Sequence, residues 1–282
     1  MPGRMNRGVP VTEADVERWI AQGYGQGEGA LYKPWLTVRD VPSKGRSHRP
    51  PCLKSGRELH LLSDREMACF LHAQFSPIVV DIREQFALLP RESTEQIADV
   101  MGVRHPRYFG SRANQVMTTD FLLTLRSANH GYRYIAISVK PSDKLLPLEK
   151  NRRTQELLEI ERRYWNARGI DWRQFSDQHM NPMVIKTLQK LLMWRIAYAD
   201  ISADGFAKPF AKIINEQHNV FTNLRALIDY AAANVGLPCL VDRFGMFAYT
   251  VWLGLIPINM AQPLAPIYPV RLKETNHGYS PL

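Results

Sequence analysis

Hydrophobic and polar positions alternate along several short segments in the first two thirds of the chain. Residues 78–86 follow the period of two that is expected of a strand. Residues 117–125 and 132–140 have the same strand-like character, and the intervening sequence RSANHG suits a turn, so these segments predict a hairpin. A last short strand is expected around residues 170–176.

Apolar residues recur at helical spacing between these strands. The segment that starts at Ser63, with Glu66 three positions later, has the sequence of a helix N-terminus followed by apolar positions on one face. Two more helices are expected, one over residues 94–102 and one over residues 153–165 that Gly169 ends. The mixture of strands and helices predicts an α/β domain.

The pattern changes after residue 177, where helices with few charges replace the mixed elements. Residues 181–200 and 221–236 each predict a helix, and short strand-like turns and a Pro-rich tail follow residue 260. We therefore expect an α/β domain over residues 1–177 and a smaller, mainly helical, winged-helix-like domain over residues 178–282.

The composition adds a basic surplus to this picture. The 282 residues include 36 Lys and Arg against 27 Asp and Glu, a formal net charge of +9, which favours anionic partners, nucleic acid before others. Three cysteines without a CxxC pair argue against a zinc site and a secreted disulfide framework. Because the chain has neither a signal-peptide-like start nor 18 uninterrupted apolar residues, we expect a cytoplasmic protein with no membrane partner.

A stretch rich in Gly, Pro, Lys and Arg, with little periodicity, runs from residue 25 to residue 57. It has two interpretations. It is either a basic arm that lies along a DNA backbone or a leader segment that packs on the α/β domain.

Asp120 and Lys140 lie at the start of one expected strand and at the end of the next. If the strands pair through their turn, the two charges meet at the far end of the hairpin. An ion pair would explain this arrangement without any catalysis. Alternatively, Asp120 binds Mg²⁺ while Lys140 orients a water and offsets developing charge, as phosphodiester hydrolysis requires.

Such a metal site needs a second carboxylate, and Glu66 is the candidate. Ser63 and Glu66 also have the spacing of a capping box, in which the glutamate only accepts the N-cap amide hydrogen. Spacing alone favours the capping role.

The loop over residues 103–114 is the candidate for contact with DNA. It either binds phosphates or is a solvated surface loop, and its basic side chains are Arg104, His105, Arg107 and Arg112. The chain has no GxxxxGKS, GxSxG or HExxH motif, so nucleotide hydrolysis, α/β-hydrolase chemistry and zinc proteolysis lose their main signatures.

Several long motifs run in a fixed order through roughly residues 20–177. They are GQGEGALYKPWLTVRDVPSKGRS, HLLSDRE, VVDIREQFALLP, IAD, VRHPRY, VMTTDFLLT, ISVKPSD and LLEIERRYW. This series resembles the TnsA family, the restriction-endonuclease-like subunits of heteromeric cut-and-paste transposases. The resemblance implies a restriction-endonuclease-like core and a Mg²⁺-dependent endonuclease, with Mn²⁺ able to substitute, that nicks the 5′ ends of a transposon. The implied partners are transposon-end DNA, a TnsB-like DDE transposase and a TnsC-like ATPase.

The resemblance also implies the residues of the site. The family's acidic helix residue falls on Glu66, its metal-binding aspartate on Asp120 and its lysine on Lys140. The metal ligands would then be Glu66, Asp120 and the backbone carbonyl of Val139. The remaining positions of the implied site, which support these groups, are Ser138, Glu161 and Gln85.

Ser138 departs from the family, in which this position is commonly Gln and, in most restriction-like nucleases, an acid. A hydroxyl is a weaker metal ligand than a carboxylate. This departure leaves open a non-catalytic adaptor of the same fold that bridges the transposase and the ATPase. A stand-alone restriction or repair nuclease of the same fold is a further alternative. In the transposition interpretation, residues 178–282 would bind a partner protein.

Overall fold

The structure is a computed structural model that describes residues 9–41, 45–127, 129, 131–197 and 204–273. The chain divides into two compact units. The first comprises Met1–Gln74 and Ile78–His179, and the second comprises Phe75–Pro77 and Met180–Leu282. The second unit therefore begins close to the boundary predicted from the sequence, and it also takes in a three-residue segment from the first half of the chain.

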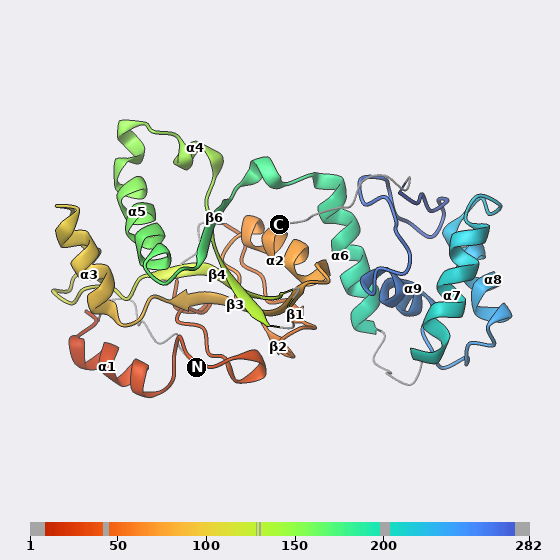
Figure 1. Ribbon diagram of the computed structural model, residues 1–282, viewed down its shortest axis with the longest axis horizontal. Coiled ribbons are helices and arrows are strands. Elements are labelled where there is room, and N and C mark those ends of the chain that lie inside the picture. The colour runs from red at the N-terminus through yellow and green to blue at the C-terminus, as the bar shows by residue number, and fades with distance from the viewer. Residues whose placement is uncertain (1–8, 42–44, 128, 130, 198–203, 274–282) are drawn as a thin grey trace. The chain divides into compact units, whose positions relative to one another are not determined.

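The first unit is built on a mixed four-stranded sheet in the order β3-β4-β5-β6 (Figure 1). Its strands are β3 (Val79–Ala87), β4 (Thr118–Arg126), β5 (Tyr132–Val139) and β6 (Asp171–Phe175). β3, β4 and β5 are antiparallel neighbours, and β6 pairs with β5 in parallel. The predicted hairpin is β4–β5, and all four strands lie in segments that the residue pattern predicts.

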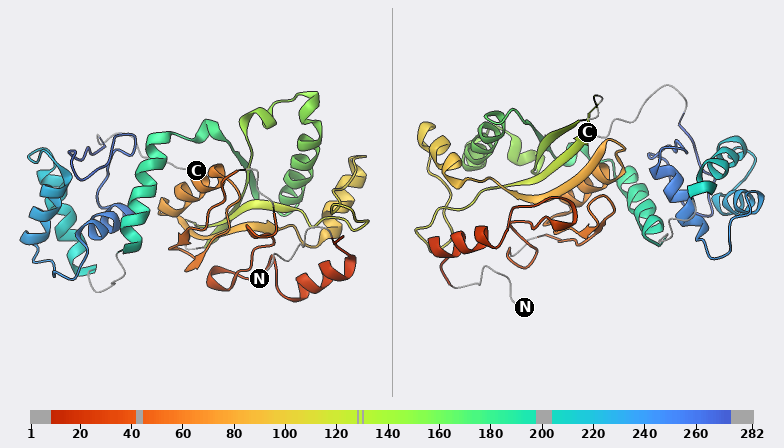
Figure 2. Two further views of the ribbon diagram at one scale, coloured as in Figure 1. Left: turned by 180° about the vertical axis from the view of Figure 1, so that it is seen from behind. Right: turned by 60° about the horizontal axis from the view of Figure 1, so that its bottom comes forward.

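Helices flank this sheet, with α1 on one side and α5 on the other in both views of Figure 2. The helical elements of the first unit are α1 (Glu13–Ala21), η1 (Gly29–Leu31), α2 (Asp64–Phe75), α3 (Arg91–Val100), α4 (Ser142–Leu145), η2 (Glu149–Asn151), α5 (Arg152–Asn166) and η3 (Asp177–His179). A two-stranded ribbon, β1 (Pro51–Cys52) with β2 (Arg57–Glu58), precedes α2. α5 provides the crossover that two parallel neighbours such as β5 and β6 require.

The described residues of the basic stretch, 25–41 and 45–57, contribute side chains that pack on the sheet. Tyr32 is 3% exposed and Trp35 is fully buried. Arg57 forms a bidentate ion pair with the fully buried Glu84 of β3, with N–O distances of 2.8 and 2.6 Å. These contacts fit a leader packed on the domain, and contact of the exposed basic side chains of this stretch with DNA stays a prediction.

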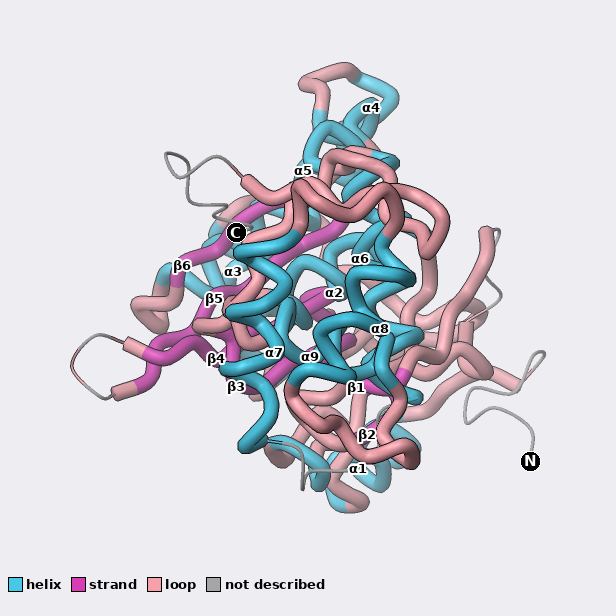
Figure 3. Tube along the Cα trace, turned by 90° about the vertical axis from the view of Figure 1, so that its right-hand side faces the viewer, coloured by secondary structure: helices cyan, strands magenta, loops and turns pink. Residues whose placement is uncertain are grey.

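The second unit is mainly helical in the residues that the structure describes. Its helices are α6 (Pro182–Ala197), α7 (Asp204–Gln217), α8 (Leu224–Asn234) and α9 (Arg243–Trp252) (Figure 3). The sequence pattern predicted α6 and α8 but not α7 or α9. α7 was missed because Pro209 lies inside it, and an internal proline usually argues against a helix.

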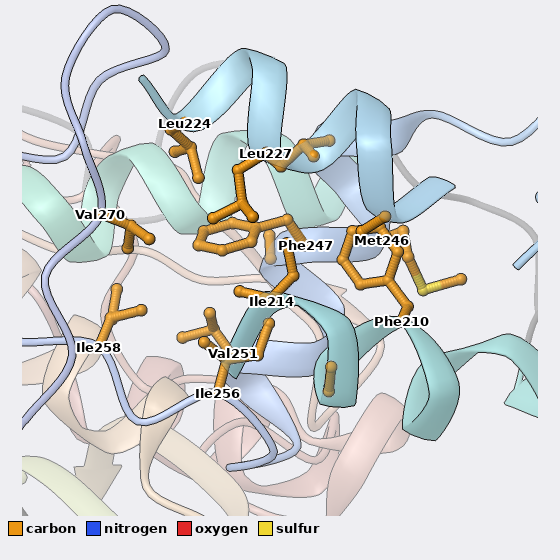
Figure 4. Close-up of a cluster of buried hydrophobic side chains, with 14 of the residues drawn as sticks. Phe210, Ile214, Leu224, Leu227, Met246, Phe247, Val251, Ile256, Ile258 and Val270 are labelled. Carbon is orange, nitrogen blue, oxygen red and sulfur yellow. The ribbon is translucent and has the colours of Figure 1, made fainter. Parts of the chain in front are cut away.

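These helices enclose their own hydrophobic core, which includes Phe210, Ile214, Leu227, Met246 and Phe247 (Figure 4). After α9, the β structure among the residues placed up to residue 273 is a single antiparallel bridge between Ile258 and Leu272. The helical character predicted for this unit is confirmed, but the winged-helix detail is not.

Two further observations concern both units. No helix within the described residues is both long and apolar enough to cross a membrane. The three cysteines are free thiols, with Cys52 and Cys69 buried in the first unit and Cys239 exposed in the second.

Candidate active site

Asp120 and Lys140 meet where β4 begins and β5 ends. The antiparallel register places Phe121 opposite Ile137, so the residue before Phe121 lies beside the end of β5. The Lys140 Nζ is 2.8 Å from Asp120 Oδ2, and the backbone N–H of Val139 donates to the same oxygen at 2.6 Å. The structure therefore brings together the two residues that the strand pattern singles out.

Glu66 lies in the first turn of α2, where it is 6% exposed. Its N–H donates to Ser63 Oγ at 3.1 Å, while its carboxylate accepts from the Leu62 N–H at 2.9 Å and from the Ser63 hydroxyl at 3.0 Å. Burial, and then the nearby charge of Asp120, raise the pKa of Glu66 to about 7. Glu66 thus takes part in the helix cap and faces Asp120 as well.

Gln85, in β3, joins the two carboxylates. Its Nε2 lies 3.3 Å from Glu66 Oε2 and 3.5 Å from Asp120 Oδ1. Its Oε1 accepts from the Thr118 hydroxyl at 3.4 Å. Because Gln85 is only 2% exposed, this amide reaches both acids inside the protein rather than across solvent.

Ser138 points its hydroxyl at Glu161 of α5 rather than at the two acids, with an Oγ–Oε2 distance of 3.1 Å. The other oxygen of Glu161 accepts from the Thr119 hydroxyl at 2.8 Å and from Trp172 Nε1 at 3.1 Å. Burial raises the pKa of Glu161 to about 7, with Lys140 acting to lower it and Asp120 to raise it. Ser138 therefore anchors a second buried carboxyl group beside the site.

Lys140 is the cation of the site. Burial acts to lower the pKa of its amine, but Asp120 and then Glu161 outweigh burial and raise it above the ordinary value. The amine also donates to the carbonyl of Val139 at 3.0 Å. Lys140 is therefore charged at neutral pH, which suits it to hold a water or offset negative charge and not to accept a proton.

The groups around Asp120 fit a hard divalent cation, which prefers oxygen ligands. Glu66 and Asp120 supply two carboxylates, and Val139 supplies a backbone carbonyl next to them. The repulsion that helps raise the pKa of Glu66 is the interaction that a cation would relieve. Among the residues whose placement is described, no three His, Cys, Asp or Glu side chains cluster closely enough to hold a metal by themselves. A site here would therefore include neutral oxygen ligands.

The loop that leads into β4 carries the basic residues predicted to contact DNA. Arg104, Arg107 and Arg112 are exposed, and their contact with DNA stays a prediction. His105 is 8% exposed, its Nε2 lies 3.0 Å from the Thr94 hydroxyl and its Nδ1 lies 3.1 Å from the Pro106 carbonyl. The expected surface position of His105 is therefore wrong: the ring packs inside the domain, and burial lowers its pKa.

Three residues around Glu161 were missed by the sequence pattern. Thr119 and Trp172 bind Glu161 directly, and Trp165 Nε1 donates to Thr119 Oγ1 at 2.6 Å. One signal was present, because Glu161 and Trp165 are four residues apart and so share a face of α5.

A cavity of about 520 Å³ adjoins the site. Lys140 and Glu161 line it together with Trp35, Tyr108 and Leu158, so charged groups of the site share this cavity with a largely apolar lining. A second cavity of about 700 Å³ is lined by other residues, including Phe86 and Arg168, and by none of the acids of the site. Only the smaller of these two cavities therefore borders the candidate chemistry.

Comparison of the chain with known proteins finds a matching family. The family described as "TnsA-like endonuclease N terminal" matches residues 76–177. The transposon Tn7 transposition protein TnsA of Escherichia coli is 43% identical over 208 residues, which cover 73% of this chain and 72% of that protein. Asp120, Lys140 and Gln85 lie inside the family match, and Glu66 lies before it.

Proposed function

The chain belongs to the TnsA family of transposon endonucleases, and on that premise we propose that it nicks the 5′ ends of a transposon in a Mg²⁺-dependent reaction. The observation that carries the proposal is that Asp120 contacts Lys140 directly and is linked to Glu66 through the buried amide of Gln85. The mixed sheet and its flanking helices support a restriction-endonuclease-like core for the first unit.

Each residue has a role in this reaction. Glu66, Asp120 and the carbonyl of Val139 would hold Mg²⁺, with Mn²⁺ as a substitute, and the ion supplies positive charge to the phosphate and to the attacking water. Lys140 orients that water and offsets charge on the phosphate oxygens. Asp120 holds the Lys140 amine in place through their 2.8 Å contact.

DNA and two proteins are the proposed partners. Arg104, Arg107 and Arg112 are exposed on the loop that leads directly into the strand of Asp120, which supports contact with the phosphates of transposon-end DNA. We assign 5′ cleavage to this chain and 3′ cleavage and joining to a TnsB-like DDE transposase. The second unit, with its own core, is the proposed winged-helix-like module that binds a TnsC-like ATPase.

The decisive test is Asp120→Ala in a reconstituted reaction with transposon-end DNA, both partner proteins and Mg²⁺. Because the substitution removes one carboxylate and leaves Lys140 without its partner, we expect 5′ nicks to be lost while 3′-end joining continues. Asp143→Ala, which changes an exposed acid nearby, is the control and should cut normally. Double-strand excision by the Asp120→Ala protein would refute the assignment.

The same reaction separates the two alternatives. One observation favours the adaptor alternative. The Ser138 hydroxyl is directed at Glu161 rather than at Glu66 and Asp120, so it supplies no ligand to a metal held by those two acids. If the chain were only an adaptor, no 5′ nicks would form even in the complete reaction with the transposase and the ATPase. A stand-alone nuclease would cut without the transposase and the ATPase.

A further inference from the structure

Gln85 stands at an unusual point in the backbone. Its φ is +46°, a left-handed conformation that residues other than glycine rarely adopt. The register pairs Glu84 with Phe121 and Phe86 with Thr119, so Gln85 and Asp120 lie between these pairs. The distortion is therefore located beside the catalytic aspartate.

The leader segment holds this backbone in place. The N–H of Trp35 donates to the Gln85 carbonyl at 3.1 Å, and the Tyr32 hydroxyl donates to the neighbouring carbonyl of Glu84 at 3.0 Å. Tyr32 and Trp35 are both buried. The fold thus stabilises a strained residue whose side chain ends between two acids.

The contacts of the Gln85 amide are weak enough to exchange. Its two N–O distances to the acids and its contact with Thr118 are all between 3.3 and 3.5 Å, at the long limit for hydrogen bonds. The terminal torsion of a glutamine is broad and nearly two-fold, so the amide can exchange its nitrogen and oxygen at little cost. Its oxygen is a suitable ligand for Mg²⁺.

The neutral side chain expected at this site is already engaged elsewhere, because Ser138 directs its hydroxyl to Glu161. The proposed metal would therefore have two carboxylates and the Val139 carbonyl, and room for a further neutral ligand. We propose that Gln85 is a metal ligand with two states. Without metal, its amide nitrogen hydrogen-bonds Glu66 and Asp120; when metal enters, its amide oxygen binds the cation. This inference rests on the proposed metal-dependent function and identifies the neutral side chain that substitutes for the one missing at Ser138.

The test is the affinity of the full-length protein for Mn²⁺, measured by calorimetry without DNA. Gln85→Met preserves the length of the side chain but removes both the nitrogen and the oxygen. We expect its Mn²⁺ affinity to fall by about 10-fold or more, as for loss of a group that orients or completes a metal site. If Gln85 only separated the acids, the methionine variant would bind as tightly as the unchanged protein or more tightly, and the inference would be wrong.

Two further variants keep the test decisive if Gln85→Met folds poorly. Gln85→Glu retains an oxygen but adds a third acid, so it should lower the melting temperature without metal and raise the Mn²⁺ affinity. A lower affinity in this variant would contradict a ligand role. Thr118→Val is the matched control, because it removes only the partner of Oε1; its affinity should be equal or higher, and a loss as large as that of Gln85→Met would overturn the inference.

Asp120→Ala separates this inference from the proposed function in the same calorimetric experiment. Loss of Mn²⁺ binding in Asp120→Ala together with unchanged binding in Gln85→Met would refute the role of Gln85 alone. Unchanged binding in Asp120→Ala would instead refute the metal site itself. Weaker binding in both variants supports both proposals.

Discussion

At the scale of single residues, the site contains two buried carboxyl groups, Glu66 and Glu161, whose pKa values the protein shifts. The pKa of Glu66 and that of Glu161 are each raised to about 7, in both cases chiefly by burial. The folded state therefore keeps protons on these groups that the unfolded state has already released. Their contribution to stability is complete below the ordinary carboxyl pKa and is lost as the pH rises through about 7.

This sign predicts how Glu66→Gln changes the pH dependence of stability. Glutamine is neutral at every pH. Between pH 5 and pH 8, the unfolding free energy of the variant should therefore fall by about 3 kcal/mol less than that of the unchanged protein, for a pKa shift of this size. The measurement is urea unfolding with a chelator present. The exposed acid Glu92 provides the control, and Glu92→Gln should follow the unchanged protein. Parallel pH profiles for Glu66→Gln and the unchanged protein would contradict the prediction.

Much of the site could be predicted at this scale because its positions follow simple periods. Asp120 and Lys140 meet through strand alternation and antiparallel pairing, and Glu66 follows from the spacing of a helix start. The contacts of Gln85 depend on a left-handed backbone that no residue pattern reveals. His105 was misplaced because a basic loop sequence does not show that one of its side chains turns inward.

At the scale of elements, the ion pair between Arg57 and Glu84 ties the β1–β2 ribbon to β3. Glu84 is fully buried and also accepts from the His60 N–H at 3.0 Å. Leader and strand are thus joined next to Gln85, whose position decides the geometry between the acids. The sequence left the role of the leader open, because its Gly- and Pro-rich composition has no period to indicate what it packs against.

Arg57→Met tests how strongly this pair holds the elements together. It leaves a buried carboxylate without its charged partner, so we expect the unfolding free energy to fall by about 3–5 kcal/mol. The double variant Arg57→Met with Glu84→Gln should recover part of the loss in urea unfolding. The control is Arg49→Met, because the Arg49–Glu58 pair is exposed and such pairs contribute at most about 1 kcal/mol. Equal losses in the two single variants would contradict the prediction.

At the scale of the whole molecule, the chain has two units with separate cores. This favours a separate role for each unit, cleavage for the first and partner binding for the second. In the first unit, the four strands of the sheet and the helices α2, α3 and α5 could be predicted because they have clear periods, whereas α1, α4 and the β1–β2 ribbon were missed. The second unit could be predicted only as helical, since α7 contains a proline and the packing of its helices is set by contacts far apart in sequence.

A truncation after His179 tests this division. We expect the shortened protein to retain the circular dichroism of an α/β fold and to lose binding to the ATPase partner in a pull-down assay. Full-length Asp120→Ala is the control, because its second unit is unchanged and it should bind the ATPase normally. Full binding by the truncated protein would show that the partner surface lies in the first unit.

The distribution of thiols has a practical consequence for such measurements. Cys52 and Cys69 are buried in the first unit, whereas Cys239 is exposed between α8 and α9. A maleimide fluorophore should therefore react with Cys239 in the native protein and leave the nuclease unit unmodified. The natural sequence thus allows the arrival of a partner at the helical unit to be followed by fluorescence anisotropy without any engineered cysteine.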